Sequence, residues 1–229
     1  MNFRSIYFLA FSLFLLSATQ IHSDRSTAFK DNDEGQSSKV FALKLPEIID
    51  FAGEVVPIEF PDIKERFDKE LLVNTYWQSN MLLLLKRANK YFPLIETILE
   101  EEGIPDDFKY LAVIESALEN ARSPKGAKGF WQIMPNTGRE YGLEVNANVD
   151  ERYHLEKSTR VASSYLIKAK KRLGSWTLAA ASYNRGMSGI SRLLKKQLAD
   201  NYYDLLLNNE TNRYIFRILA VKEIMSHPD

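Results

Sequence analysis

A succession of helical apolar patterns, which begins after Pro61 and continues to the end of the chain, limits the fold more than any other feature. Charged residues at helical spacing start a first helix at Asp62, and apolar residues recur at the same period in the later segments. Strand signals are weak, except for a short irregular or hairpin segment between Arg122 and Gly142. The sequence therefore predicts a mainly α domain, with further helices at Tyr91–Glu102, from Pro105, and at Glu156–Leu173, Thr177–Tyr183 and Glu210–Met225.

The N-terminus differs from the rest of the chain. Arg4 precedes an apolar run from Ile6 to Leu16, and small and polar residues follow up to Ser23. The run is shorter than the roughly 20 residues of a membrane span, and the layout is that of a secretory signal peptide. We predict a signal peptide at residues 1–23 and an exported protein of the periplasm or cell envelope. An uncleaved anchor is the alternative.

The next segment divides the chain into domains. Residues 24–39 are polar, as in a flexible linker, and residues 40–60 contain apolar runs broken by prolines. We expect a linker and extended segment over 24–60 and a helical domain over 61–229, with a catalytic core at about 90–226.

Composition excludes several classes of function. Lys plus Arg and Asp plus Glu number 30 each, so no charge excess points to nucleic acid. The chain has no cysteine, which excludes disulfides, thiol chemistry and a lipid anchor on cysteine. The three histidines are scattered, so we expect no metal site and no cofactor.

One carboxylate lies within an apolar helical stripe. Phe108, Leu111, Ala112 and Leu118 share a face with Glu115 in the helix that starts at Pro105. Loss of hydration favours the protonated form of a carboxyl group, and glycosidic cleavage needs such an acid. A structural glutamate paired with a lysine or arginine is the alternative.

The loop after this helix carries a specific resemblance. The run ESALENARSPKGAKGFWQIMPNTGREYGL is similar to the signature of lytic transglycosylases of the soluble lytic transglycosylase (goose-lysozyme-like) superfamily, in particular the membrane-bound murein type D. The Glu-Ser pair and the Gly-rich Gln-x-Met block match in order and spacing. Ala181-Ser182-Tyr183-Asn184 resembles the Ala-Tyr-Asn motif, and Glu210-Thr211 with Tyr214 resembles the Glu-Thr-x-x-Tyr motif. The resemblance covers roughly residues 75 to 226.

The sequence departs from the family pattern in two places. Ser182 replaces the usual alanine before Tyr-Asn. The segment between Glu115 and Ser123 is about one residue shorter than in many relatives and lacks their Asn-Pro.

The resemblance implies a fold and a set of site residues. It implies a lysozyme-like helical catalytic domain in which Glu115 is the catalytic acid and base. The substrate-binding residues would be Ser116, Ser123, Gln132, Met134, Tyr183, Asn184 and Tyr214. The glycines of the loop allow tight turns, and the amide of Gln132 can both donate to and accept from a sugar.

The resemblance also implies the reaction, with peptidoglycan glycan strands as the substrate. Glu115 would protonate the β-glycosidic oxygen of the MurNAc-(1→4)-GlcNAc bond and then deprotonate the C6 hydroxyl of the same MurNAc, which closes a 1,6-anhydro ring. A lysozyme-like muramidase is an alternative that needs a second carboxylate, for which Glu119, Glu140, Glu144 and Asp150 are the candidates. A non-catalytic wall-binding protein is the other alternative.

Overall fold

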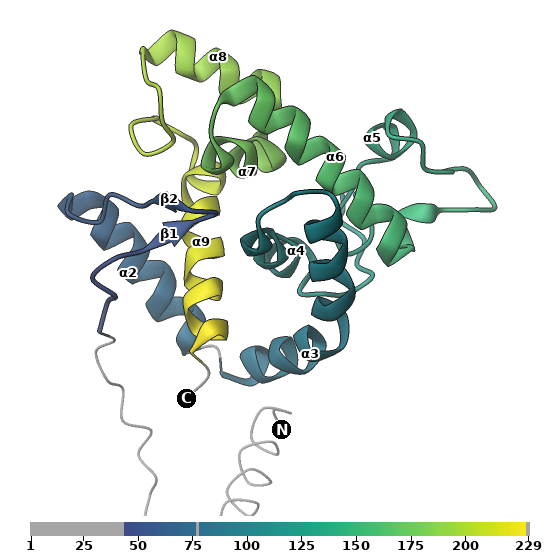
Figure 1. Cartoon of the computed structure of the whole chain (residues 1–229), viewed down its shortest axis with the longest axis horizontal. Helices are drawn as coiled ribbons and strands as arrows, with labels where there is room; N and C mark the ends of the chain where they lie inside the picture. Colours follow the sequence, from purple (N-terminus) through teal and green to yellow (C-terminus); the bar gives the residue numbers. More distant parts are fainter. Residues whose placement is uncertain (1–43, 77, 228–229) are drawn as a thin grey trace, which may run out of the picture. The chain divides into compact units, whose positions relative to one another are not determined.

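The computed structural model describes residues 44–76 and 78–227, and helices dominate this part of the chain (Figure 1). The mainly α fold predicted from the sequence is confirmed. The predicted signal peptide at 1–23 and residues 24–43 of the predicted linker lie outside the described residues. The elements are β1 (Asp50–Phe51), β2 (Glu54–Val55), α2 (Pro61–Thr75), α3 (Gln78–Glu101), η1 (Asp106–Phe108), α4 (Lys109–Ser116), α5 (Pro135–Glu140), η2 (Glu151–Tyr153), α6 (Leu155–Leu173), α7 (Trp176–Arg185), α8 (Met187–Gln197) and α9 (Asn209–Ser226).

Helix α9 connects the elements that carry the predicted site. It packs along α2, beside which it runs in Figure 1, and it also contacts α4 and α7. Tyr214, Ile215, Phe216, Ile218 and Leu219 are all buried, whereas Arg213 and Arg217 on the remaining face of α9 are only partly buried. A helix with so wide an apolar face packs against several other elements. The packing of α9 therefore fixes where α4 and α7 lie relative to one another.

The segment before α2 belongs to the folded domain, although the sequence analysis placed it in a linker and extended segment. Lys44, the first described residue, already belongs to the compact unit, and Phe51 and Val56 are buried in it. The Phe51 ring packs edge-on against Phe108, with ring centroids 5.1 Å apart. β1 and β2 form an antiparallel hairpin that the sequence analysis did not predict. The folded domain thus extends upstream of residue 61.

Besides α4, three helices differ clearly from the sequence predictions. Helix α3 begins at Gln78, not at Tyr91, and runs through Pro93. Proline removes one backbone hydrogen bond, but Ile95, Ile98 and Leu99 are buried on the following turns, and this burial stabilises the helix across the proline. Helices α5 and α8 were not predicted.

The end of α4 is the difference that matters most for the site. The apolar stripe predicts a helix that includes Leu118, but α4 ends at Ser116 because Ala117 and Leu118 both have positive φ, at 54° and 55°. Left-handed backbone costs a non-glycine residue about 1–2 kcal/mol. The buried side chain of Leu118, which is 1% exposed, anchors the turn. The chain therefore leaves the helix directly after Glu115 and Ser116.

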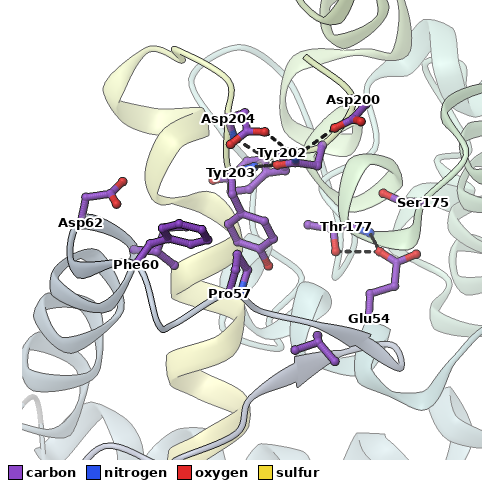
Figure 2. Close-up of a pocket in the computed structure, with 13 residues that line it drawn as sticks. Glu54, Pro57, Phe60, Asp62, Ser175, Thr177, Asp200, Tyr202, Tyr203 and Asp204 are labelled. Atoms are coloured by element: carbon purple, nitrogen blue, oxygen red, sulfur yellow. Dashed lines mark hydrogen bonds between the residues drawn. The ribbon is translucent and has the colours of Figure 1, made fainter.

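Glu54 in β2 connects the hairpin to the N-terminus of α7 (Figure 2). Its carboxylate accepts hydrogen bonds from the backbone N–H groups of Trp176 at 2.6 Å and Thr177 at 2.9 Å, and from the Thr177 hydroxyl at 2.8 Å. Lys170 pairs with it at 3.0 Å. Burial alone would raise the pKa of Glu54, but these hydrogen bonds outweigh burial and lower it.

We expect Glu54→Ala to destabilise the domain, because it leaves the first N–H groups of α7 without an acceptor. The expected loss is about 1–3 kcal/mol of unfolding free energy at neutral pH, measured by urea denaturation. Since the folded-state pKa of Glu54 is lowered, its contribution is present above the usual glutamate pKa and is lost as the pH falls, so the difference should shrink in acid. Glu59→Ala, at an exposed position, is the control. Equal stability of the Glu54 variant and the wild type at neutral pH would contradict this role.

Candidate active site

Glu115 lies in the last turn of α4, in the wall of a cavity of about 320 Å³. The wall is otherwise largely apolar and includes Met81, Leu84 and Val113. Arg217 of α9 also lines this cavity, together with Asn74, and the same two residues line a neighbouring cavity of about 500 Å³. Because the two cavities share these residues, we describe them together as the α9 groove.

Burial raises the pKa of Glu115 to about 7, and its surroundings partly oppose this shift. The Tyr214 hydroxyl donates a hydrogen bond to Glu115 Oε1, which favours the charged form and lowers the pKa. The positive charge of Arg217 also lowers it, whereas the negative charge of Glu210 raises it. Desolvation is the largest effect. The carboxyl group can therefore both lose and regain its proton near neutral pH.

Tyr214 is held firmly on α9. Its side chain is 3% exposed, and burial, together with the negative charge of Glu115, raises its pKa well above the usual range. The hydroxyl thus stays protonated and remains a hydrogen-bond donor. This donor fixes the orientation of one Glu115 oxygen.

Tyr183 and Asn184 of α7 connect the loop that contains Trp131 to the start of α9. The Tyr183 hydroxyl donates to the backbone oxygen of Trp131 at 2.8 Å, and the charge of Glu115 adds to burial in raising the pKa of Tyr183. Asn184 donates to Glu210 at 3.0 Å and accepts from the Thr211 hydroxyl at 2.8 Å. The structure therefore brings α4, α7 and α9 together around Glu115, as the order of the motifs suggested.

The loop from Arg122 to Met134 depends on Arg152, which the sequence analysis did not select. The buried Arg152 guanidinium donates to the backbone oxygens of Gly126 at 2.8 Å and Ile133 at 3.0 Å and pairs with Asp150 at 2.7 Å. Gly129 has a φ of 80°, and a Cβ there would lie 2.0 Å from the Arg152 carbonyl oxygen. Gly129 is thus required by the protein's own backbone.

Gln132 and Met134 line a small cavity of about 60 Å³, which Tyr183 also lines. Gln132 has a φ of 47°, and its side-chain N–H groups donate to the backbone oxygens of Ala121 at 3.1 Å and Gly129 at 2.8 Å. Its amide oxygen has no hydrogen-bond partner within the described residues. Met134 is 43% exposed, whereas Trp131 is fully buried and donates to Thr159 at 2.9 Å. Trp131 is therefore a core residue of the domain.

The two predicted serines make local hydrogen bonds. Ser116 donates to the backbone oxygen of Ala112, one turn earlier in α4, at 3.2 Å, although it also lines the cavity of Glu115. The Ser123 hydroxyl accepts from the backbone N–H of Ala127 at 2.9 Å and so closes the turn that contains Gly126. Their assignment to substrate binding stays a prediction.

The carboxylates that the sequence analysis considered as a second catalytic group are engaged elsewhere. Glu119 forms an ion pair with Arg87, and Glu140 pairs with Lys168 at 3.3 Å. Glu144 accepts from Asn146 at 2.7 Å. Hydrogen bonds from Arg152 hold the pKa of Asp150 well below its usual range. Glu210 was not among these candidates, but it is a carboxylate whose negative charge raises the pKa of Glu115.

A further cavity of about 510 Å³ lies away from Glu115, between the hairpin segment and the loop after α8. Figure 2 shows Phe60, Pro57 and Tyr203 on one side of it and Glu54 with Thr177 on the other. None of the predicted site residues lines it. Within the described residues, no helix is long and apolar enough to cross a membrane, and no group of three or more His, Cys, Asp or Glu side chains can hold a metal ion.

Comparison with known proteins finds a family model that matches part of the chain. Residues 94–205 match the family model of the transglycosylase SLT domain. Over these residues the chain is similar to a transglycosylase SLT domain. This match and the helical architecture confirm the lysozyme-like helical class expected from the resemblance.

Two curated relatives agree with the family match. The membrane-bound lytic murein transglycosylases D of Escherichia coli K12 and of strain CFT073 are each 30% identical over 186 residues, which cover 77% of this chain and 40% of the relative. This chain thus spans less than half the length of these curated relatives. A solved structure of an inactive mutant of the lytic transglycosylase Slt from Pseudomonas aeruginosa is 22% identical and covers 59% of this chain and 24% of that one, with a TM-score of 0.46.

The raised pKa of Glu115 predicts a pH-dependent effect on stability. Because the pKa of Glu115 rises from 4.5 to about 7 on folding, its carboxyl group binds more protons in the native state between these values, and its contribution to stability falls as the pH rises through this window. Glu115→Gln removes the charge and keeps an acceptor for Tyr214. The unfolding free energy of Glu115→Gln, taken relative to that of the wild type, should therefore be roughly 3 kcal/mol higher at pH 8 than at pH 4.

Chemical denaturation at the two pH values measures this gain. Glu100→Gln is the matched control, because Glu100 is exposed on α3 and makes no ion pair within the described residues. The difference in unfolding free energy between Glu100→Gln and the wild type should be the same at pH 4 and pH 8. If the difference for Glu115→Gln were also the same at both pH values, Glu115 would not be desolvated.

Proposed function

We propose that the chain is a peptidoglycan lytic transglycosylase that cleaves the bond between MurNAc and GlcNAc and leaves 1,6-anhydro-MurNAc ends. The observation that carries this proposal is the desolvated carboxyl group of Glu115, which lines the α9 groove and receives a hydrogen bond from Tyr214. The transglycosylase SLT domain and the murein transglycosylase relatives support the choice of substrate.

The first step is protonation of the leaving group. With a pKa of about 7, Glu115 carries its proton in about half of the molecules at neutral pH. It donates this proton to the glycosidic oxygen, while the N-acetyl group of the MurNAc helps to stabilise the positive charge at its anomeric carbon. The Tyr214 hydroxyl then stabilises the carboxylate that remains.

The second step uses the same residue as the base. The ionised Glu115 takes the proton of the C6 hydroxyl, and the C6 oxygen attacks the anomeric carbon of its own ring. This attack is intramolecular and needs no activated water. We propose that the amide oxygen of Gln132 and the exposed face of Met134 contact the sugar from the side of the small cavity, together with Tyr183. We assign Ser116, Ser123 and Asn184 to positioning the site.

Lysozyme-like hydrolysis is the second candidate, and one observation favours it. The charge of Glu210 acts on Glu115, and Glu210 lines the α9 groove. A second carboxylate that activates water would release reducing ends in place of anhydro ends. Glu210 accepts a hydrogen bond from Asn184 at 3.0 Å, and we propose that it orients α7 against α9.

We also propose that the enzyme works in the cell envelope after export, guided by the N-terminal 23 residues. The layout of these residues and the location of peptidoglycan support this, as does the membrane-bound murein enzyme among the relatives.

Mass analysis of the products from purified sacculi tests the reaction. We expect muropeptides with anhydro ends, each lighter by one water molecule than the hydrolysis product. Reducing ends would contradict transglycosylation and support hydrolysis with Glu210. Undigested sacculi would support a non-catalytic wall-binding protein.

Variants test the role of Glu115. Glu115→Gln should lower the rate by at least about a thousandfold, because the variant has neither an acid nor a base. Glu119→Gln, at an exposed and ion-paired carboxylate on the adjacent turn, is the control and should retain activity within a few-fold. Equal activity of Glu115→Gln and the wild type would refute the assignment.

A further inference from the structure

Arg217 has an unusual environment for a partly buried arginine. It lines both cavities of the α9 groove, yet within the described part of the chain it makes no ion pair and no hydrogen bond. Every other described arginine that is partly or fully buried has such a partner: Arg66, Arg87, Arg152, Arg160 and Arg213. Desolvating a guanidinium is costly unless it is paired. Arg217 therefore offers an unused charge to a ligand.

The neighbouring arginine on α9 shows the contrast. Arg213 lies one turn before Arg217 and lines the same groove, but its Nε and Nη2 atoms donate to the two oxygens of the buried Glu70 carboxylate, at 2.5 and 3.1 Å. The charge of Arg213 is thus neutralised within the protein. Of these two arginines, Arg217 is the one free to bind an anion.

The position of Arg217 places this charge beside the reacting bond. It follows Tyr214 by three residues and so lies on the same face of α9. It shares the wall of the 320 Å³ cavity with Glu115, and its charge acts on that carboxyl group. A group bound to Arg217 would therefore belong to a sugar at, or next to, the bond that is cleaved.

We propose that Arg217 is a specificity-determining residue that binds a carboxylate on the lactyl arm of the MurNAc unit. A guanidinium binds a carboxylate with two parallel hydrogen bonds. On a peptidoglycan strand, that carboxylate comes either from the lactyl group itself, once the peptide is removed, or from the attached peptide stem. This inference rests on the proposed function, because it names the part of the substrate that the same groove selects.

Binding at Arg217 would also affect the acid. An anion there cancels the positive charge that now lowers the pKa of Glu115. Substrate binding and the protonated form of Glu115 would then favour one another.

The test compares Arg217→Gln with the wild-type full chain on three forms of glycan strand: strands with intact peptide stems, strands whose stems have been removed to leave a free lactyl carboxylate, and the latter strands with that carboxylate converted to a neutral amide. Arg217→Lys keeps the positive charge but lacks the planar guanidinium that can donate two parallel hydrogen bonds to a carboxylate. Arg192→Gln, at an exposed position on α8 that lines none of these cavities, is the matched control.

We expect Arg217→Gln to raise KM by roughly tenfold or more on one or both anionic forms, with a smaller change in kcat, and to leave KM unchanged on the amidated strands. Arg217→Lys should recover part of the loss. A loss confined to stem-bearing strands assigns the carboxylate to the peptide, and a loss confined to the stripped strands assigns it to the lactyl group.

Two results would overturn the inference: an equal effect of Arg217→Gln on all three substrates, or no effect on any of them. If the wild-type enzyme cleaves none of the three strands, this result contradicts the proposed function itself, and with it the inference that rests on it. Circular dichroism and melting of each variant confirm that the fold is kept.

Discussion

The hydrogen bond from Tyr214 to Glu115 joins the two helices on which the site depends. Glu115 ends α4, and Tyr214 lies in the buried middle of α9. Burial of the carboxyl group favours its neutral form, whereas the tyrosine hydroxyl and the charge of Arg217 favour the ionised form. Because these effects oppose one another, the pKa lies near 7 and not far above it. The proposed role of Glu115, first as acid and then as base, needs this balance.

The remaining motif residues mostly hold one another in place. Tyr183 bonds to the backbone at Trp131, Gln132 bonds to the backbone of its own loop, and Asn184 joins Glu210 to Thr211. Arg152 supports the loop from within, and Glu54 holds the N-terminus of α7. A site built on such supported elements keeps its geometry when a polymer binds, because few of its side chains must be ordered at that moment.

Much of the fold and of the candidate site could be predicted from the sequence, because helical periodicity and the spacing of motifs are local properties. The start of α2, most of α6 and α9, and the position of Glu115 in an apolar stripe follow from them. The stop of α4 at Ser116 could not be predicted, because the left-handed backbone of Ala117 and Leu118 is unusual for these residue types and accompanies tertiary contacts such as the burial of Leu118. The roles of Glu54 and Arg152 depend on contacts with residues distant in sequence or on loop closure, which no periodicity reveals. Among the partly or fully buried arginines of the described residues, Arg217 is set apart by having no hydrogen-bond or ion-pair partner, which the sequence alone does not reveal.

The central claim is that Glu115 is a desolvated acid with a pKa near 7, and direct titration of that carboxyl group tests it best. Infrared difference spectra between the wild type and Glu115→Gln, recorded from pH 4 to pH 9, isolate the protonated carboxyl band of this one residue. The account predicts that the band is lost with a midpoint of about 7. A midpoint near the ordinary glutamate value of 4.5 would contradict it, because Glu115 would then be ionised at neutral pH and unable to protonate a glycosidic oxygen.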